Sequence, residues 1–133
     1  MDELVVKYYR HMCRKGFEHT GELPSTSIFL DTVGEKIRIC SHVSHAYLHI
    51  YINVRDAVID DIKYLCICDP TANVVVEMLC NLIKGKTIEE AAALTEGSFV
   101  RLLGGGGEEF LKKVRGIIEL LRRGIARYRA AAR

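Results

Sequence analysis

The hydrophobic pattern of the sequence changes at Asp69-Pro70, and this change limits the folds open to the chain. Before it, roughly residues 28–40, 46–54 and 58–68 have strand character, and the 46–54 run alternates with a period of two. After it, apolar residues recur at helical spacing. Asp before Pro is a helix start, because Asp caps free amides and Pro lacks the amide that would be unpaired. The pattern therefore predicts an α+β fold with strands first and helices afterwards.

The strands are expected to form a three-stranded antiparallel meander covered on one face by helices. Arg55-Asp56-Ala57 predicts the hairpin between the last two strands, and a meander with one apolar face needs a cover. Helices are predicted over 2–13, from Pro70 to a stop at Gly85, over 87–94, and after the glycine run 104–107. With 49% apolar residues in 133, we expect one domain spanning 1–133 with its own core.

Composition and charge argue against several classes of function. With 19 basic and 17 acidic residues, the net charge of +2 favours neither nucleic acid nor a membrane surface, and a single aromatic residue, Tyr128, stands among the arginines near the C-terminus. No stretch is apolar enough to cross a bilayer, and the first residues do not form a secretory signal. Five cysteines, an odd number, suit free or ligating thiols in a reducing compartment. We therefore expect a cytoplasmic protein.

Several local phrases carry a resemblance to a known family. They are VVKYYRHM at 5–12, V-I-D-D-I-K-Y at 58–64, K-G-K-T-I-E-E-A at 84–91 and I-A-R-Y at 125–128. Their content and order resemble the NifU/IscU family of iron–sulfur cluster assembly scaffolds over nearly the whole chain. The resemblance implies a [2Fe–2S] cluster assembled on three cysteines and passed to recipient proteins. It also implies a cysteine desulfurase or other iron–sulfur assembly proteins as partners, and a homo-oligomer stays open. No nucleophile and base stand at a motif spacing, so no enzymatic activity is expected.

The cysteines of this chain do not fall in the register of the family. Counting without gaps from 84–86 puts the family's second cysteine on Asp69, directly after Cys68. Counting from 125–128 puts the third on Lys113, and the first falls near Ser44. The resemblance therefore implies Cys68 and Lys113 as the residues beside the cluster, and a shift of one residue would bring Cys68 to the second position.

From the residue types alone, one hypothesis is a metal pocket with relocated ligands. Its candidate ligands are Cys40, His42, His45, Cys66, Cys68 and Asp69. Thiolate, imidazole and carboxylate groups suit zinc or ferrous iron, and the positive end of a helix favours a thiolate beside it. Cys66 and Cys68 are two residues apart on a strand, so both thiols point to the same face. The cargo would be a [2Fe–2S] cluster or an iron or zinc ion.

Two other hypotheses explain the same residues. In one, Asp69 is only a helix cap, the cysteines are small buried residues, and the chain is a cluster-free interaction module. In the other, one exposed cysteine, best Cys68, carries a persulfide, as in the related SufE-like sulfur acceptors. The three hypotheses differ in thiol dependence: several ligands, none, or a single essential thiol.

Overall fold

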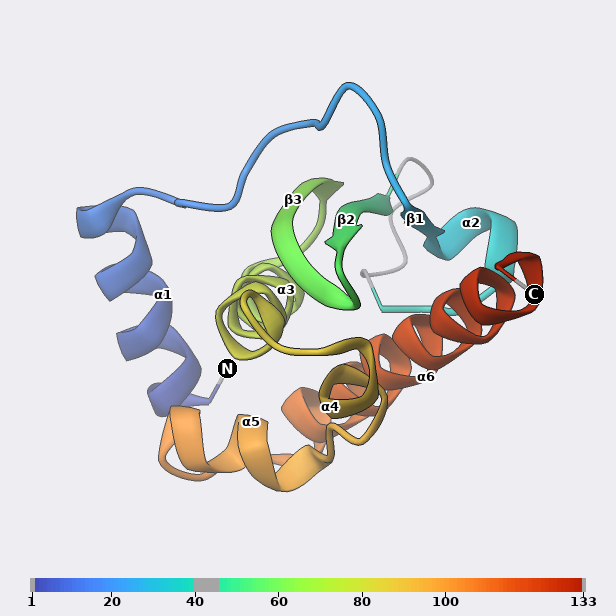
Figure 1. Ribbon diagram of the computed structural model, residues 1–133. Coiled ribbons are helices and arrows are strands. Elements are labelled where there is room, and N and C mark those ends of the chain that lie inside the picture. The colour runs from blue at the N-terminus through green and yellow to red at the C-terminus, as the bar shows by residue number, and fades with distance from the viewer. Residues whose placement is uncertain (1, 40–45, 133) are drawn as a thin grey trace.

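The computed structural model describes residues 2–39 and 46–132 (Figure 1). Its elements are α1 (Glu3–Lys15), β1 (Ile28–Asp31), α2 (Thr32–Glu35), β2 (Tyr47–Arg55), β3 (Val58–Ile67), α3 (Pro70–Ile83), α4 (Ile88–Ala92), α5 (Glu96–Leu103) and α6 (Glu108–Ala131). Three of the predicted metal ligands, Cys40, His42 and His45, lie outside the described residues. Within the described ranges, no helix is both long and apolar enough to cross a membrane.

The three strands form one antiparallel sheet in the order β1-β2-β3, which confirms the predicted meander. Asp56 and Ala57 connect β2 to β3 with φ angles of 52° and 63°, as a two-residue hairpin turn of the primed type requires. The inner face is closely packed: Leu30, Ile50 and Ile62 are fully buried. The predicted α+β class and hairpin position are therefore confirmed.

The first strand is shorter than the run 28–40 predicted. It ends at Asp31, whose Oδ1 accepts a hydrogen bond from Val33 N at 3.1 Å and caps the short helix α2. At the next position Thr32 Oγ1 accepts from Leu48 N at 3.1 Å, so a side chain replaces the backbone pairing that a strand would make. The prediction of a strand beyond residue 31 is wrong because the local cap at Asp31 and the contact of Thr32 with Leu48 compete with backbone pairing in the sheet.

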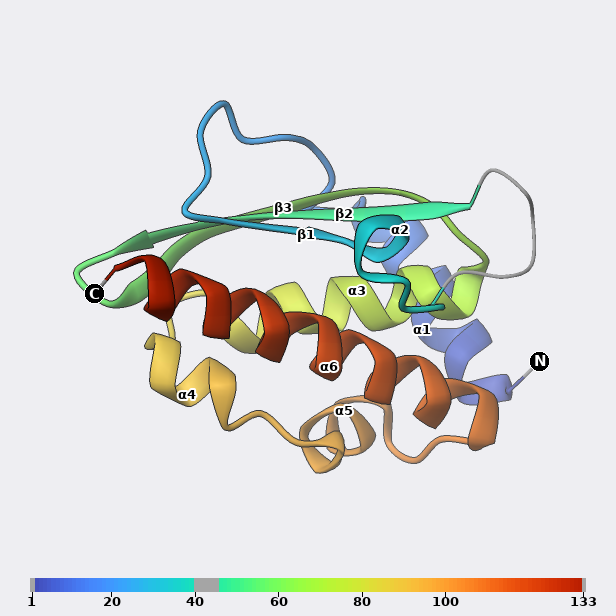
Figure 2. The same ribbon diagram turned by 90° about the vertical axis from the view of Figure 1, so that its right-hand side faces the viewer.

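The sheet's apolar face is covered by helices (Figure 2), with α3 and α6 beneath the strands and α4 and α5 farther out. In α3 the consecutive residues Val74, Val75 and Val76 are all fully buried. A helix that is apolar all round belongs in a core rather than on a surface. The helical cover predicted from the sequence is confirmed, and α3 is its centre.

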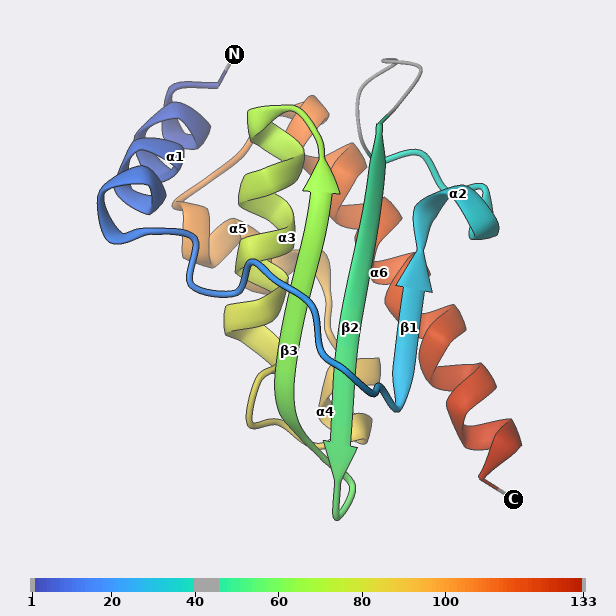
Figure 3. The same cartoon turned by 90° about the horizontal axis from the view of Figure 1, so that it is seen from above.

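The segment 16–27 crosses the opposite face of the sheet (Figure 3) and fastens to its β3 edge. Tyr64 N donates to His19 O at 2.9 Å, and Gly21 N donates to Tyr64 O at 2.8 Å. His19 also reaches the core, because its Nδ1 lies 2.8 Å from Oε1 of the buried Glu77 in α3. The segment therefore covers the edge of β3 that no strand of the described chain pairs with.

Helix α5 was not predicted from the sequence. It begins after Thr95, whose side chain makes no capping hydrogen bond, so the usual start signal is weak. Phe99 is fully buried in this helix, and Gly104 ends it in the left-handed conformation. Tertiary burial of one apolar side, rather than a local motif, accounts for α5.

Helix α6 approaches β1 closely at Gly124. A Cβ atom at this position would overlap Cδ2 of Leu30 and lie 3.1 Å from Cγ2 of Ile28, both buried residues of β1. Glycine therefore sets the distance between the long helix and the sheet edge. By contrast, a Cβ at Gly97 in α5 would make ordinary contacts, with the end of the Arg101 side chain at 3.4 Å and with Thr95 Oγ1 at 3.7 Å.

We predict that Gly124→Ala destabilises the protein by about 1–3 kcal/mol, because the added methyl overpacks the contact between α6 and β1. The matched change Gly97→Ala should be neutral or stabilising by up to about 1 kcal/mol, since alanine is the better helix former. Urea unfolding of both variants measures the change in the free energy of unfolding. The slope of that free energy against urea concentration is compared between the variants. Equal effects of the two substitutions would contradict the close packing at Gly124.

Candidate functional site

The start of α3 gathers the reactive side chains of the described chain. Strand β3 ends at Ile67, Cys68 follows, and Asp69 caps the helix by accepting a hydrogen bond from Ala72 N on its Oδ1 at 2.9 Å. Pro70 occupies the first helical position. The predicted cap is confirmed. The thiols therefore lie at the positive end of the helix, where negative charge is favoured.

Asp69 is also joined to Lys113 of α6. Its Oδ2 lies 3.0 Å from Lys113 Nζ, and the two side chains are only 21% and 11% exposed. The same Nζ donates to the carbonyl oxygen of Ile39 at 2.6 Å. Both oxygens of Asp69 are thus engaged, one in the cap and one in the ion pair. The sequence predicts Asp69 as a metal ligand, but neither of its carboxylate oxygens is free of a strong contact.

Cys66 and Cys68 form a thiol pair. Both are half-buried, both pack against the core, and their side chains are hydrogen-bonded to each other. The hydrogen bond from Cys68 lowers the pKa of the Cys66 thiol, against the opposing effects of burial and of the charges on Asp69 and Glu77. The thiolate is the form that binds metals and attacks sulfur. This pair is therefore the most reactive group at the start of α3.

Two described residues anchor the chain on either side of segment 40–45 to this same place. Before it, Ile39 O accepts from Lys113; after it, Tyr47 O lies 3.4 Å from Cys68 Sγ. The sequence between these anchors carries three of the predicted ligands, Cys40, His42 and His45. Their own positions lie outside the described residues, so the predicted pocket stays a prediction there.

The other described cysteines are separate from this site. Cys80 is fully buried in α3, and burial raises the pKa of its thiol well above the ordinary value. Cys13 is exposed near the end of α1. In the ranges 2–39 and 46–132, no group of three or more His, Cys, Asp or Glu side chains could hold a metal ion. A metal at the thiol pair would therefore need a donor from elsewhere.

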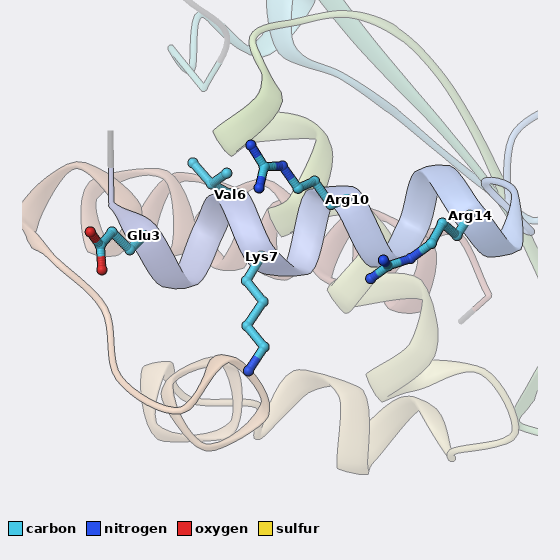
Figure 4. Close-up of a pocket in the computed structure, with 5 residues that line it drawn as sticks. All are labelled: Glu3, Val6, Lys7, Arg10 and Arg14. Atoms are coloured by element: carbon cyan, nitrogen blue, oxygen red, sulfur yellow. The ribbon is translucent and has the colours of Figure 1, made fainter.

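A hollow of about 470 Å³ lies along the outer side of α1 (Figure 4). Its lining is Glu3, Val6, Lys7, Arg10 and Arg14. This lining includes neither a thiol nor an imidazole, and cations dominate it. With Glu3 as its one possible metal ligand, the hollow lacks a ligand set for iron or zinc, which leaves the start of α3 as the candidate site.

Comparisons with known proteins agree with this fold. Residues 18–133 match the family model described as the NifU-like N terminal domain. The chain is similar to the solved N-terminal part of a nitrogen-fixing NifU-like protein from Brucella abortus, with 11% identity, TM-score 0.62, and coverage of 97% of this chain and 94% of that one. It is also similar to a proposed iron–sulfur cluster assembly scaffold protein for the SUF system from Fervidobacterium islandicum, with 14% identity, TM-score 0.64, and coverage of 94% and 96%. At these identities the likeness concerns the fold. A comparison with curated protein sequences gives no match.

We predict that Cys68→Ala raises the pKa of the Cys66 thiol, because the hydrogen bond that lowers it is removed. Less thiolate would then be present near neutral pH, so iodoacetamide would modify Cys66 more slowly. The rate of iodoacetamide modification at Cys66 is followed by peptide mass spectrometry across a pH series. In Cys68→Ala the midpoint of its pH dependence should lie at higher pH than in the wild-type protein. Cys13→Ala is the matched control and should leave that midpoint unchanged. An unmoved midpoint in Cys68→Ala would contradict the thiol pairing.

Proposed function

Because the chain belongs to the NifU-like N-terminal domain family, we propose that it acts in iron–sulfur cluster assembly as a non-catalytic, scaffold-type protein. One structurally similar protein is described as a proposed assembly scaffold for the SUF system, which supports this role. The iron, or the cluster built from it, is here the cargo that is received and passed on. Cysteine desulfurase and other assembly proteins are the partners that such a role requires.

The observation that carries the proposal is the meeting of Asp69 and Lys113. These are the positions onto which the ungapped register puts the family's second and third cysteines. They are 44 residues apart in the sequence, and their side chains lie 3.0 Å apart. Residues that replace two ligands of one cluster would have to converge in this way. The register is thereby supported, and the cargo site is proposed at the start of α3.

The donor chemistry decides which residues there could hold the cargo. Cys66 and Cys68 fit, because adjacent thiolates are the ligands that iron–sulfur clusters and zinc prefer. Asp69 fits poorly, since both its oxygens are engaged, and Lys113 is a cation without a lone pair to donate. We therefore propose Cys68 and Cys66 as ligands, completed by Cys40 with His42 or His45. Lys113 would offset the negative charge of the thiolates.

A second candidate, a sulfur acceptor, is favoured by the lowered pKa of Cys66 and its contact with Cys68. In this role the Cys66 thiolate takes the proton of the neighbouring Cys68 thiol, and the Cys68 thiolate so formed attacks the terminal sulfur of a persulfide on the donor. A new S–S bond forms at Cys68, the old S–S bond breaks, and the donor cysteine leaves as a thiolate. The exchange needs no external oxidant.

Reconstitution without oxygen tests the scaffold proposal. The purified protein is treated with ferrous iron, sulfide and a thiol reductant, then desalted, and bound iron and sulfide are measured together with the visible absorption spectrum. We expect iron and sulfide in stoichiometric amounts, and loss of most of both in Cys66→Ser, Cys68→Ser and Cys40→Ser. Chelation of the bound iron should abolish the visible absorption.

Cys13→Ser is the matched control, because Cys13 is an exposed thiol of α1 rather than of the start of α3, and its loss should change nothing. Wild-type protein that stays free of iron would overturn the scaffold proposal. Treatment with a cysteine desulfurase and cysteine then separates the remaining candidates. A mass increase of one sulfur atom that is lost in Cys68→Ser would support the sulfur acceptor. If neither experiment depends on a thiol, the cluster-free interaction module is the hypothesis that remains.

A further inference from the structure

A groove of about 190 Å³ lies between β1 and the C-terminal part of α6, away from the thiol site. Its main lining residues are Ile28 and Phe29 of β1 with Gly124, Arg127, Tyr128 and Ala131 of α6. The four α6 residues follow the spacing of one helix face. Gly124, packed against Ile28 and Leu30, closes one end of the groove, and the small side chain of Ala131 leaves the other end open. In Figure 3 this part of α6 lies at the opposite end of the sheet from the start of α3.

The edge of β1 above this groove is unpaired. β1 bonds to β2 on one side, and on its other side no strand from the described part of the chain pairs with it. Figure 2 looks toward this edge, with α6 running beneath the sheet. At such an edge every second residue presents its N–H and C=O groups outward, free to bond another chain. The opposite edge, at β3, is instead covered by residues 19–21.

Apolar surface also lies on the other face of the same edge. Phe29 is 43% exposed, and its ring centroid is 5.2 Å from that of His49 and 5.3 Å from that of Tyr51. Side chains of an extended chain alternate between the two faces of a sheet. A strand added beside β1 would thus place one set of side chains in the groove and the other set against Phe29.

We propose that this β1–α6 groove binds an extended segment of a partner protein, which adds to the sheet as a fourth strand beside β1. Backbone hydrogen bonds to the free edge would supply part of the affinity, and the groove would select an aliphatic side chain at alternate positions. This inference goes beyond the proposed role in cluster assembly and does not depend on the thiol pair.

Charge indicates that the partner segment is acidic. The C-terminal half of α6 carries the exposed cations Arg122, Arg123, Arg127 and Arg129. Their ion-pair partners among the described residues are only Glu119 and Glu35, so cations outnumber carboxylates there. Arg127 lines the groove, and its side chain is 52% exposed. A carboxylate on the added strand would complement it. A second copy of this chain would instead bring another Arg127 to the same edge, where like charges repel.

Selection from a phage-displayed library of random linear peptides, with the wild-type chain as bait, tests the proposal. We expect enriched peptides with apolar residues at every second position and an acidic residue among the others. When the peptide that binds most tightly is added to ¹⁵N-labelled protein, the changes in amide chemical shift should concentrate at residues 27–31 and 124–131. Peptides that shift other regions, or a selection that enriches none, would overturn the proposal.

Backbone pairing is tested by N-methylation of that peptide. Methyl groups on the amides that face β1 should abolish binding, whereas methyl groups on the alternate amides should be tolerated. Arg127→Glu should weaken binding about tenfold, and Arg122→Glu, an equal charge change on α6 outside the groove, by less than about twofold. Binding insensitive to N-methylation would overturn strand addition. If the same changes in amide chemical shift appear when the protein alone is concentrated, the β1 edge binds a second copy of this chain instead, and the proposal is overturned.

Discussion

The burial of α3, in which ten of fourteen residues are buried, is the constraint on which the rest of the structure depends. Val74, Val75 and Val76 are consecutive and fully buried, so they point in different directions around the helix and none of them meets water. Such a helix needs cover on all sides, which the sheet, α1, α5 and α6 provide together. Because these elements hold most of α3, its first turn is held as well. Cys66 at the end of β3, and Cys68 and Asp69 in the short connection to α3, are thereby held between a strand and a fixed helix start.

One carboxylate inside this core ties the outer segment of the chain to it. Glu77 is buried in α3, and its Oε1 accepts from His19 N at 3.2 Å and contacts His19 Nδ1 at 2.8 Å. Its Oε2 has no hydrogen-bond partner among the described residues. A buried carboxylate is costly unless it is paired, so the contact with His19 is required once Glu77 lies in the core. It holds segment 16–27 across the sheet, where this segment closes the β3 edge.

Local signals in the sequence predict most of the fold, whereas contacts between distant residues escape them. The period of two in β2 and the cap at Asp69 act over a few residues, so the sheet and the start of α3 are readable. The end of β1 is not, because it depends on Thr32 meeting Leu48 across the sheet. The ion pair of Asp69 with Lys113 joins residues 44 apart and has no local pattern. Only the register implied by the family resemblance brings these two positions together.

Helix α6 links the two ends of the molecule that the proposals concern. Near its start, Lys113 holds Asp69 and Ile39 at the thiol site; near its end, Arg127 lines the β1–α6 groove. Fourteen residues of helix separate these positions, which corresponds to roughly 20 Å along the axis. A strand bound at the groove would therefore leave the thiol pair uncovered. In the proposed scaffold role, cargo would be loaded and released while partners are engaged, and a docking edge separated from the thiols would allow both sites to be occupied at once.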